Sequence, residues 1–298
     1  MSLPIVAVTA GDPSGIGPEI SVKASTDPRV LAVCKPVIYG PHRVEELARF
    51  VTGRVHPDSG RAAYGAIVSA VNDARAGRVA AVVTAPINKA ALTAAGLPWR
   101  GHTELLAHLC AVDDPVMLFW SDLLKVALAT VHIPLAEVPK ALTPDRLRGV
   151  VRTVARELPR FGIAAPRLAV AGLNPHAGEG GIIGTEDRDL FAPVVAELRT
   201  EGLDVTGPLS ADTVFGRAVR GEFDAVIAAY HDQGLIPVKL LSPGKAVNVT
   251  LGLPIVRTSV DHGTAFDIAG KGVADPSSLV EAILLAVRLS NERIERVE

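Results

Sequence analysis

Three histidines, His132, His176 and His231, each follow closely on a short apolar run of the kind that forms buried strands. The carboxyl ends of neighbouring parallel strands meet at one edge of an α/β sheet, so the three imidazoles can converge there. Three protein ligands leave a coordination position of a metal ion open, as in catalytic zinc sites. Imidazole ligation favours Zn²⁺, Co²⁺ or Ni²⁺ over Mg²⁺, and Asp212 and Asp232 could act as supporting or additional ligands. Taken singly, each histidine could equally be a hydrogen-bonded loop or core residue.

Several polar and cationic residues could hold an anion. The segment Gly101–Glu104, with the sequence Gly-His-Thr-Glu, opens a helical pattern. The free amides of a helix N-terminus bind anions, and an ordinary helix cap is the alternative. Lys239, Lys245 and Arg257 lie near the same predicted sheet edge. A strand-end arginine such as Arg257 suits two-point capture of a carboxylate or phosphate, although each cation could also be a solvated surface charge.

Two glycine-rich segments could bind a nucleotide. The first, Gly11–Glu19, follows a predicted strand and opens a helix. It lacks the G-x-G-x-x-G order of a Rossmann turn and the Gly-Lys-Ser/Thr of a P-loop. The second, Val260–Gly272, gathers three glycines, a histidine and two aspartates around a short apolar turn. This composition is compatible with a loop that wraps an adenine nucleotide.

The elements that must position these residues alternate along the chain. Helical apolar stripes occur between the short apolar runs, for example from Leu147 to Leu158 after a Thr143 cap and Pro144. This alternation of strands and helices predicts an α/β fold with a largely parallel sheet. The predicted strands are Ile5–Thr9, Val37–Tyr39, Ala80–Thr84, Met117–Ser121, Val126–Thr130, Leu168–Ala171, Ala225–Ala229, Val247–Leu251 and Ile255–Thr258.

Composition narrows the class of protein. The 298 residues suffice for two compact domains or one large one, and 48% of them are hydrophobic. The net charge of −2 argues against a nucleic-acid partner or a basic membrane-surface protein. We expect no membrane span and no signal peptide, because the apolar runs are too short. Cys34 and Cys110 stand alone in apolar surroundings, so a reducing, cytoplasmic setting is expected.

Several motifs occur in a fixed order along the chain. They are Gly11–Glu19, Val83–Lys89, Gly101–Glu104, Gly172–Glu179, Gly207–Thr213, Tyr230–Gly234 and Ala274–Pro276. In these motifs the sequence resembles the 4-hydroxythreonine-4-phosphate dehydrogenase family, including its four-carbon acid phosphate paralogues, within the isocitrate/isopropylmalate dehydrogenase-like superfamily. The resemblance implies two α/β/α domains with a cleft between them. We place a cofactor-side domain at residues 1–100 plus 245–298, and a metal, substrate and dimerisation domain at 101–244.

The resemblance also implies roles for residues at matching positions. Metal ligands are implied at His132, His176 and His231, with one divalent ion per subunit, taken as Zn²⁺ with Co²⁺ or Mg²⁺ as alternatives. Substrate contacts are implied at His102, Thr103, Lys239, Asn248 and Arg257. Contacts to NAD or NADP are assigned to Gly11, Asp12, His262, Gly263, Thr264, Asp267, Gly270 and Asp275. Candidates for proton relay are Lys239, Asp212 and Asp232. The family is homodimeric, and the partner subunit completes each active site.

These features predict metal-dependent oxidation of a phosphorylated four-carbon hydroxy acid by NAD(P)⁺, with decarboxylation of the β-keto acid product. The stretch Phe50–Arg61 is compact and the chain is short for the biosynthetic enzyme. The substrate could therefore be 4-phosphohydroxy-L-threonine or threonate or erythronate 4-phosphate. One alternative is a dehydrogenase of a cyclic dihydrodiol dicarboxylate, a group that lacks the Gly-His-Thr-Glu motif. Others are a three-histidine zinc hydrolase without nucleotide and a catalytically silent binding protein.

Overall fold

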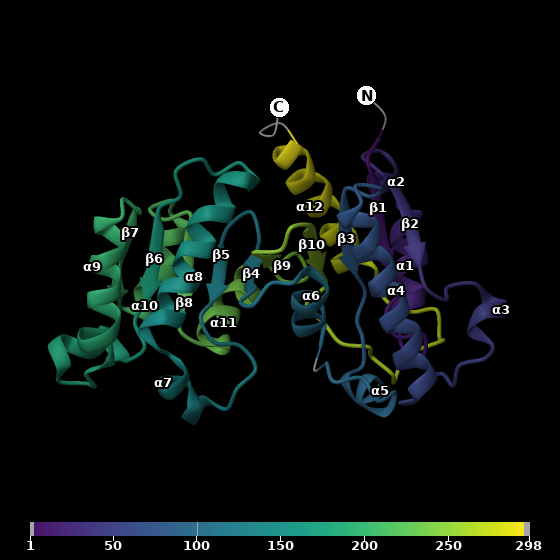
Figure 1. Ribbon diagram of the computed structural model, residues 1–298, viewed down its shortest axis with the longest axis horizontal. Coiled ribbons are helices and arrows are strands. Elements are labelled where there is room, and N and C mark those ends of the chain that lie inside the picture. Colours follow the sequence, from purple (N-terminus) through teal and green to yellow (C-terminus); the bar gives the residue numbers. More distant parts are fainter. Residues whose placement is uncertain (1–2, 100, 295–298) are drawn as a thin grey trace. The chain divides into compact units, whose positions relative to one another are not determined.

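The computed structural model describes residues 3–99 and 101–294 (Figure 1). The chain forms two compact units, one from residues 1–115 and 247–298 and the other from residues 116–246. The chain passes from the first unit to the second after Pro115, whereas we predicted this passage after residue 100. Helix α6 (His102–Cys110) explains the difference, because Leu105 and Leu106 pack into the core of the first unit. The passage back to the first unit, after Ala246, lies close to the predicted position at 244.

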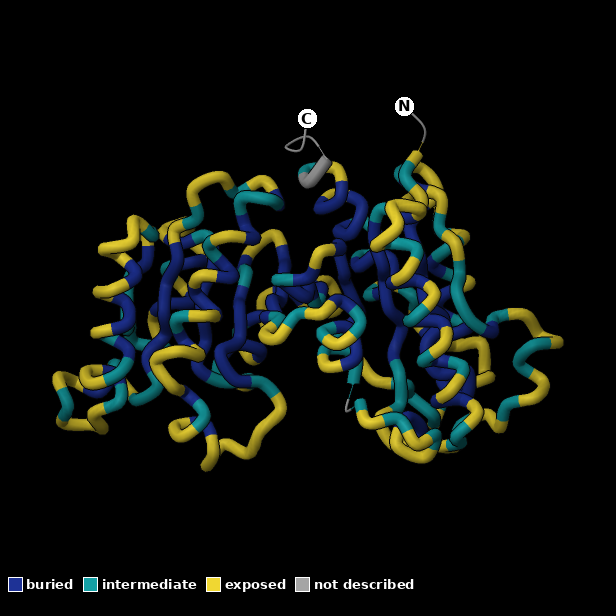
Figure 2. The backbone as a smooth tube through the Cα atoms, viewed as in Figure 1, coloured by how far each residue is buried: buried dark blue, intermediate teal, exposed yellow. Residues whose placement is uncertain are grey.

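The described residues of the first unit form five strands, in the order β2-β1-β3-β10-β9. Their bounds are β1 (Ile5–Thr9), β2 (Lys35–Tyr39), β3 (Ala81–Thr84), β9 (Val247–Leu251) and β10 (Val256–Ser259). Strands β2, β1, β3 and β10 are parallel, and β9 is antiparallel to β10. Every residue of β3 is buried, as expected of a parallel strand covered on both faces (Figure 2). In this register Thr84 lies beside Thr9 on one side and Ser259 on the other.

The described residues of the first unit form seven helices. They are α1 (Gly17–Ser25), α2 (Pro28–Leu31), α3 (Val44–Leu47), α4 (Pro57–Arg75), α5 (Lys89–Ala94), α6 and α12 (Ser277–Ile294). Helix α4 packs Ile67 and Val71 against Ala7 and Val82 in one apolar cluster. Helix α12 packs on β3, β9 and β10 and also contacts α1. The carboxyl ends of the strands are thereby left to the loops.

The second unit also contains five strands, in the order β4-β5-β8-β6-β7. Their bounds are β4 (Val116–Trp120), β5 (Lys125–Leu128), β6 (Leu168–Ala171), β7 (Val205–Leu209) and β8 (Ala225–Ala228). Strand β4 is antiparallel to β5, and the others run parallel. Strand β7 was missed from the sequence because it contains Gly207 and Pro208. Proline is tolerated in a strand at the end of the strand order, where one side needs no ladder hydrogen bonds.

The helices of the second unit follow the strands in alternation. They are α7 (Val138–Ala141), α8 (Pro144–Glu157), α9 (Ala192–Thr200), α10 (Ala211–Val219) and α11 (His231–Leu241), with short irregular turns at Leu135–Glu137, Leu158–Phe161, Pro175–Gly181 and Asp187–Phe191. Helix α8 begins as predicted, since the Thr143 hydroxyl accepts a hydrogen bond from the Arg146 amide at 3.2 Å and Pro144 occupies the first turn.

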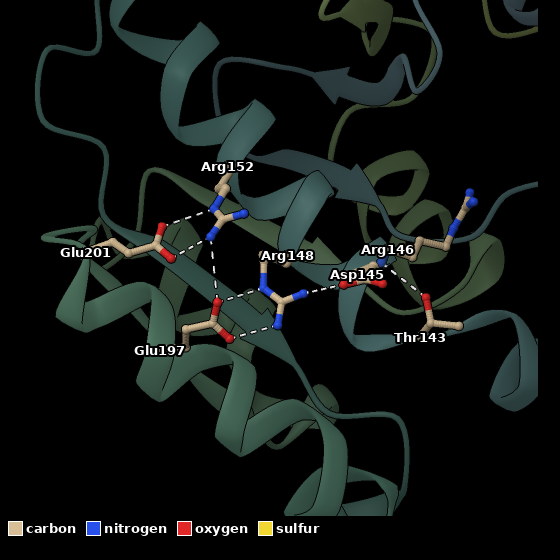
Figure 3. Close-up of polar contacts among 7 residues, drawn as sticks. All are labelled: Thr143, Asp145, Arg146, Arg148, Arg152, Glu197 and Glu201. Carbon is tan, nitrogen blue, oxygen red and sulfur yellow. Dashed lines mark hydrogen bonds and ion pairs between the residues drawn. The ribbon is translucent and has the colours of Figure 1, made fainter.

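A ladder of ion pairs joins α8 to α9 on the surface (Figure 3). The guanidinium of Arg148 contacts Glu197 at 2.8 Å, and that of Arg152 contacts Glu201 at 2.5 Å. Such exposed pairs contribute about 0–1 kcal/mol each. The buried stripe of α8, which includes Leu147 and Val151, therefore contributes more to the docking of this helix than the ladder does.

Within residues 3–99 and 101–294, no helix is both long and apolar enough to cross a membrane.

Candidate functional site

The strands that precede His132, His176 and His231 are neighbours in the second unit. They are β5, β6 and β8, which lie parallel in the order β5-β8-β6. His132 lies in the loop after β5, and His231 is the first residue of α11, after β8. Their ring centroids are 5.5 Å apart. The sequence therefore predicted correctly that these two imidazoles meet at one sheet edge.

The orientation of His231 suits metal coordination. Its Nδ1 atom hydrogen-bonds the Asp232 carboxylate at 2.7 Å, which leaves Nε2 for a ligand. A carboxylate that holds the far nitrogen of a histidine is the usual support of a metal ligand. Two imidazoles bound to one zinc ion through bonds of about 2 Å have ring centroids about 5 Å apart. His132 and His231 therefore fit a shared divalent cation.

A cavity of about 250 Å³ adjoins this pair. It is lined by Val131, His132, Ile133, Leu135, Val138, Tyr230, His231 and Asp232. Its walls combine apolar side chains with two histidines and one carboxylate, a composition typical of small-molecule sites.

His176 lies apart from this pair. Within the described part of the chain, no group of three or more histidine, cysteine, aspartate or glutamate side chains is close enough to hold a metal ion. His176 lies near Asp212 instead. A hydrogen bond from the Ser210 hydroxyl, with a smaller effect of His176, lowers the pKa of the Asp212 carboxyl. Lys239 is exposed and lies on α11, about 12 Å from His231 along the helix axis.

Four of the predicted anion-binding residues lie in the first unit: His102, Thr103, Asn248 and Arg257. His102 and Thr103 were assigned to the domain at 101–244, whereas Lys239 and Lys245 do lie in the second unit. Arg257, on β10, is only 2% exposed. Its guanidinium donates to the hydroxyls of Thr250 at 2.8 Å and Thr84 at 2.6 Å. Burial lowers the pKa of Arg257 to about 9, which still leaves it charged near neutral pH. A buried cation held only by neutral hydroxyls lacks the counter-charge that it needs.

Other polar atoms of the first unit are also buried without partners. Within the described residues, His102 Nε2, Asn248 Oδ1 and Arg257 Nε have no hydrogen-bond partner. His102 opens α6, with Thr103 in the same first turn, and Asn248 lies on β9 beside Ser259 of β10. Buried polar groups without a partner are uncommon in folded proteins, so each one calls for a physical explanation, such as a bound ion or ligand. The two nitrogen atoms could donate to an anion with several oxygens, whereas Asn248 Oδ1 can only accept, for example from a hydroxyl of the same ligand.

The environment of His102 gives a prediction on pH. Burial, and then the charge of Arg257, hold the pKa of His102 well below its ordinary value. The unfolded chain binds a proton there below about pH 6.5, and the folded chain does not, so the free energy of unfolding falls as the pH falls. We expect His102→Gln to lose less stability than the wild type between about pH 7 and pH 5 in urea unfolding. Equal losses in both proteins would contradict this environment for His102.

The two glycine-rich segments meet in the first unit. The Ile16 amide donates to the Thr264 carbonyl at 3.0 Å. A Cβ atom on Gly15 would lie 2.8 Å from that same carbonyl oxygen, so the contact requires glycine. Glu19 and Lys23 of α1 hold the end of the second segment, since Lys23 donates to the Gly272 carbonyl at 2.9 Å and Glu19 accepts from the Ala274 amide at 2.8 Å. The segments assigned to the nucleotide therefore form one surface.

The individual residues assigned to the cofactor differ in exposure. His262, Gly263, Asp267, Gly270 and Asp275 are exposed, and Thr264 is half-buried. A Cβ atom on Gly263 would meet nothing within 4 Å, so a ligand can approach the backbone closely there. Asp275 accepts from the Ser277 amide at 2.9 Å, just before α12 begins.

Gly11 and Asp12 lie deeper than the other residues assigned to the cofactor. Gly11 has a φ of +69°, and a Cβ atom there would lie 2.3 Å from the Pro86 carbonyl oxygen. Asp12 is fully buried and accepts from the Ser14 amide at 2.8 Å. Burial raises the pKa of the Asp12 carboxyl. These contacts give both residues a structural role in joining the ends of β1 and β3.

The fold and these sites can be compared with known proteins. The family model described as pyridoxal phosphate biosynthetic protein PdxA matches residues 19–286. The chain belongs to this family. A Ruegeria protein (strain TM1040) named 4-hydroxythreonine-4-phosphate dehydrogenase is 46% identical, with 97% of this chain and 98% of the relative covered. A Bradyrhizobium diazoefficiens protein provisionally named D-threonate 4-phosphate dehydrogenase is 45% identical, with 96% of each covered. The chain is thus a dehydrogenase, which implies a nicotinamide cofactor.

Solved structures agree with this family. The crystal structure of 4-hydroxythreonine-4-phosphate dehydrogenase from Klebsiella pneumoniae has a TM-score of 0.88 and 39% identity, and the match covers 97% of this chain and 98% of that one. A terephthalate 1,2-cis-dihydrodiol dehydrogenase from Burkholderia xenovorans LB400 has a TM-score of 0.68 and 33% identity, and the match covers 96% of this chain and 98% of that one. Isocitrate dehydrogenase from Methylococcus capsulatus has a TM-score of 0.55 and 18% identity, and the match covers 99% of this chain and 89% of that one. This likeness shows the shared fold. The predicted α/β fold of the isocitrate dehydrogenase type is confirmed.

Sequence analysis missed several residues that surround these sites. Thr84 and Thr250 supply the hydroxyls that hold Arg257. Gln233 and Asp187 hold the strand ends that carry the histidines. Gln233 stands inside a quoted motif, Tyr230–Gly234, but its role depends on which strands are neighbours, and the sequence does not state that.

Proposed function

We propose that this dehydrogenase oxidises a phosphorylated four-carbon hydroxy acid with NAD⁺ or NADP⁺ and a divalent metal, and that the β-keto acid product loses CO₂. The candidate substrates are 4-phosphohydroxy-L-threonine and threonate or erythronate 4-phosphate. Relatives at 45–46% identity carry names from both groups. We further propose that the protein acts in the cytoplasm as a homodimer.

The observation that carries the proposal is the buried cation of Arg257. It lies 2% exposed, bonded to two threonine hydroxyls and without a bound counter-charge. A phosphate or carboxylate would supply that charge, and the planar guanidinium would bind two of its oxygens. His102 Nε2 and Asn248 Oδ1 add unpartnered polar atoms in the same unit, and we assign them, with Thr103 and Lys239, to the substrate.

We assign the divalent ion, taken as Zn²⁺, to His132 and His231 with His176 as the third ligand, completed in the homodimer. Such an ion would polarise the substrate hydroxyl and favour loss of its proton near neutral pH. The chain's own contribution begins with Asp232, which fixes the ring of His231 through Nδ1. The apolar side chains of Val131, Ile133 and others exclude water from one wall of the neighbouring cavity.

The proton from the substrate hydroxyl needs an acceptor. We assign this role to Asp212, Asp232 and Lys239 together. Asp232 is 73% exposed at its side chain and reaches solvent, so it can pass a proton onward. The nicotinamide nucleotide is assigned to the surface formed by Gly11–Glu19 and the segment from His262 to Asp275, where it would accept the hydride.

An exposed apolar face supports the homodimer. Ile236 and Leu240 are 66% and 78% exposed on α11, the helix that begins at His231. Residues four apart share one face of a helix, and large apolar side chains grouped in this way mark an interaction surface. A dimer formed here would place the second subunit close to His231.

The experiment that tests the proposal follows NAD⁺ and NADP⁺ reduction by absorbance, with the metal-replete full chain. The panel contains 4-phosphohydroxy-L-threonine and threonate and erythronate 4-phosphates, each with its unphosphorylated counterpart as the matched control. We expect reduction with at least one phosphorylated acid and a kcat/KM about 10- to 100-fold lower without the phosphate, because one charged hydrogen-bonded group contributes about 1.5–3 kcal/mol.

Two results would contradict the proposal. Turnover of a cyclic dihydrodiol dicarboxylate without turnover of any acid phosphate would favour the activity named for the Burkholderia protein. Binding of the acid phosphates without any nucleotide reduction would favour a catalytically silent protein. The hydrolase alternative is set aside because the relatives are dehydrogenases.

A further inference from the structure

A continuous chain of hydrogen bonds runs across the strand ends of the second unit. The Thr130 hydroxyl, after β5, donates to the Ala229 carbonyl at 2.8 Å. The Ala229 amide, after β8, donates to Gln233 Oε1 at 2.7 Å. Gln233 Nε2 donates in turn to the Gly172 carbonyl, after β6, at 2.7 Å. The Gly172 amide continues the chain to the Leu209 carbonyl of β7 at 2.7 Å.

Gln233 is the only side chain in this series that joins β8 to β6 at these ends, as far as the described residues show. It lies in the first turn of α11, two residues after His231. The carbonyl that it holds belongs to Gly172, at the root of the loop that carries His176. One amide side chain therefore fixes the distance between the roots of two histidine loops.

The loop that carries His176 has an unusual backbone. His176 and Ala177 have φ angles of +52° and +53°, and Gly178, Glu179 and Gly180 continue at +75°, +45° and +70°. Left-handed backbone costs roughly 1–2 kcal/mol for each residue other than glycine. Three such residues in one run, His176, Ala177 and Glu179, need firm restraint from their surroundings.

Asp187 supplies this restraint. Its carboxylate is fully buried and accepts from the Leu173 amide at 2.7 Å, the Asn174 amide at 3.0 Å and the Asn174 side chain at 2.9 Å. A Cβ atom on Gly172 would lie 2.9 Å from Asp187 Oδ1. The loop is thus wrapped closely around one carboxylate, directly after the residue that Gln233 holds.

We infer that Gln233 is a positioning residue of the metal site, with Asp187 in support. Gln233 ties the root of the His176 loop to the first turn of α11, and Asp187 holds the start of that loop. Because His176 would reach the ion of the other subunit in the proposed dimer, this tie positions the ligands that one chain contributes to both metal sites. The inference rests on the proposed function, because it takes these histidines as metal ligands. Residues that hold metal ligands in place orient them for the ion. Loss of the hydrogen bonds of Gln233 or Asp187 should therefore lower metal affinity and distort the coordination.

The test measures Co²⁺ and Zn²⁺ binding to the full chain, by competition with a chromophoric chelator and by the visible spectrum of bound Co²⁺. Gln233→Glu keeps the acceptor for the Ala229 amide and places an oxygen against the Gly172 carbonyl. Gln233→Met removes both hydrogen bonds at similar size. We expect both variants to bind metal about 10- to 100-fold more weakly, with a changed Co²⁺ spectrum. Asp187→Asn is expected to act in the same direction.

A matched control exists at the opposite ends of the same two strands. Asp224, before β8, accepts from the Arg167 amide, before β6, at 2.8 Å. Asp224→Asn should lower the melting temperature and leave metal affinity and the Co²⁺ spectrum unchanged. If it weakens metal binding as much as the Gln233 variants do, general destabilisation explains the effect and the inference is overturned.

The remaining outcomes separate the inference from the proposed function. If the wild type binds Co²⁺ through its histidines, and both Gln233 variants match its affinity within about twofold and share its spectrum, the inference alone fails. If the wild type binds no Co²⁺, or if His231→Ala binds it equally well, the metal assignment in the proposed function fails and the inference falls with it.

Discussion

Replacing His231 by alanine is expected to remove the bound divalent ion and to lower kcat by about a thousandfold or more. The reason is that Lewis-acid assistance supplies several kcal/mol to such a reaction, and each 1.36 kcal/mol is a factor of ten in rate. The fold should survive, since the His231 side chain is 36% exposed and lies at the start of α11. Metal content by mass spectrometry and steady-state kinetics check the prediction.

His56→Ala is the matched control for this variant. His56 has a similar exposure, 42% at the side chain, and caps α4 by accepting from the Asp58 amide. Its loss should cost about 1 kcal/mol of stability and leave metal content and kcat unchanged. A fully active His231→Ala enzyme without metal would show that the chemistry does not pass through this histidine.

Arg257→Lys is expected to raise the KM for an acid phosphate by about 10- to 100-fold, with a smaller change in kcat. Lysine carries the charge but not the planar fork, so one of two charge-assisted hydrogen bonds is lost, and each is worth about 1.5–3 kcal/mol. The pKa of Arg257 is about 9 in this buried place, so arginine remains charged near neutral pH. Lysine begins about two units lower and should titrate nearer neutrality.

This difference adds a pH signature to the Arg257→Lys variant. Between about pH 7 and pH 8, the wild-type KM should stay level, whereas the variant KM should rise with pH as the lysine loses its proton. Arg152→Lys, in the exposed ladder of Figure 3, is the control and should change neither KM nor its pH dependence. An unchanged KM in Arg257→Lys at both pH values would show that this cation does not bind the acid phosphate.

The sequence predicts the strands well where they are buried on both faces. Strands β1, β6 and β9 have the predicted bounds. Strand β6 is a continuous apolar run and β1 is one up to its final threonine, whereas β9 alternates apolar residues with Asn248 and Thr250. Strand β7 was missed because Gly207 and Pro208 interrupt its apolar run. Helix α6 was assigned to the wrong unit, since an apolar stripe shows that a helix packs but not which sheet it packs on.

The sequence predicted those parts of the candidate site whose position depends only on where strands end. The pair formed by His132 and His231 follows from two parallel neighbouring strands. The frame around the pair was not predictable, because Gln233 and Asp187 are polar residues in polar segments and carry no periodic signal. The partners of Gln233 meet only when β6 and β8 lie side by side. Asp187 finds its partners only when its segment folds back on Leu173 and Asn174. Neither could the sequence show that Arg257 is buried without a counter-charge.

The most direct measurement for the metal assignment is anomalous X-ray diffraction from crystals of the protein loaded with Zn²⁺ or Co²⁺. We expect one strong anomalous peak per subunit, within about 2.2 Å of a ring nitrogen of His132 and His231 and of His176 of the other subunit. A peak at other residues, or fully loaded crystals in which His132 and His231 bind no ion, would contradict this assignment.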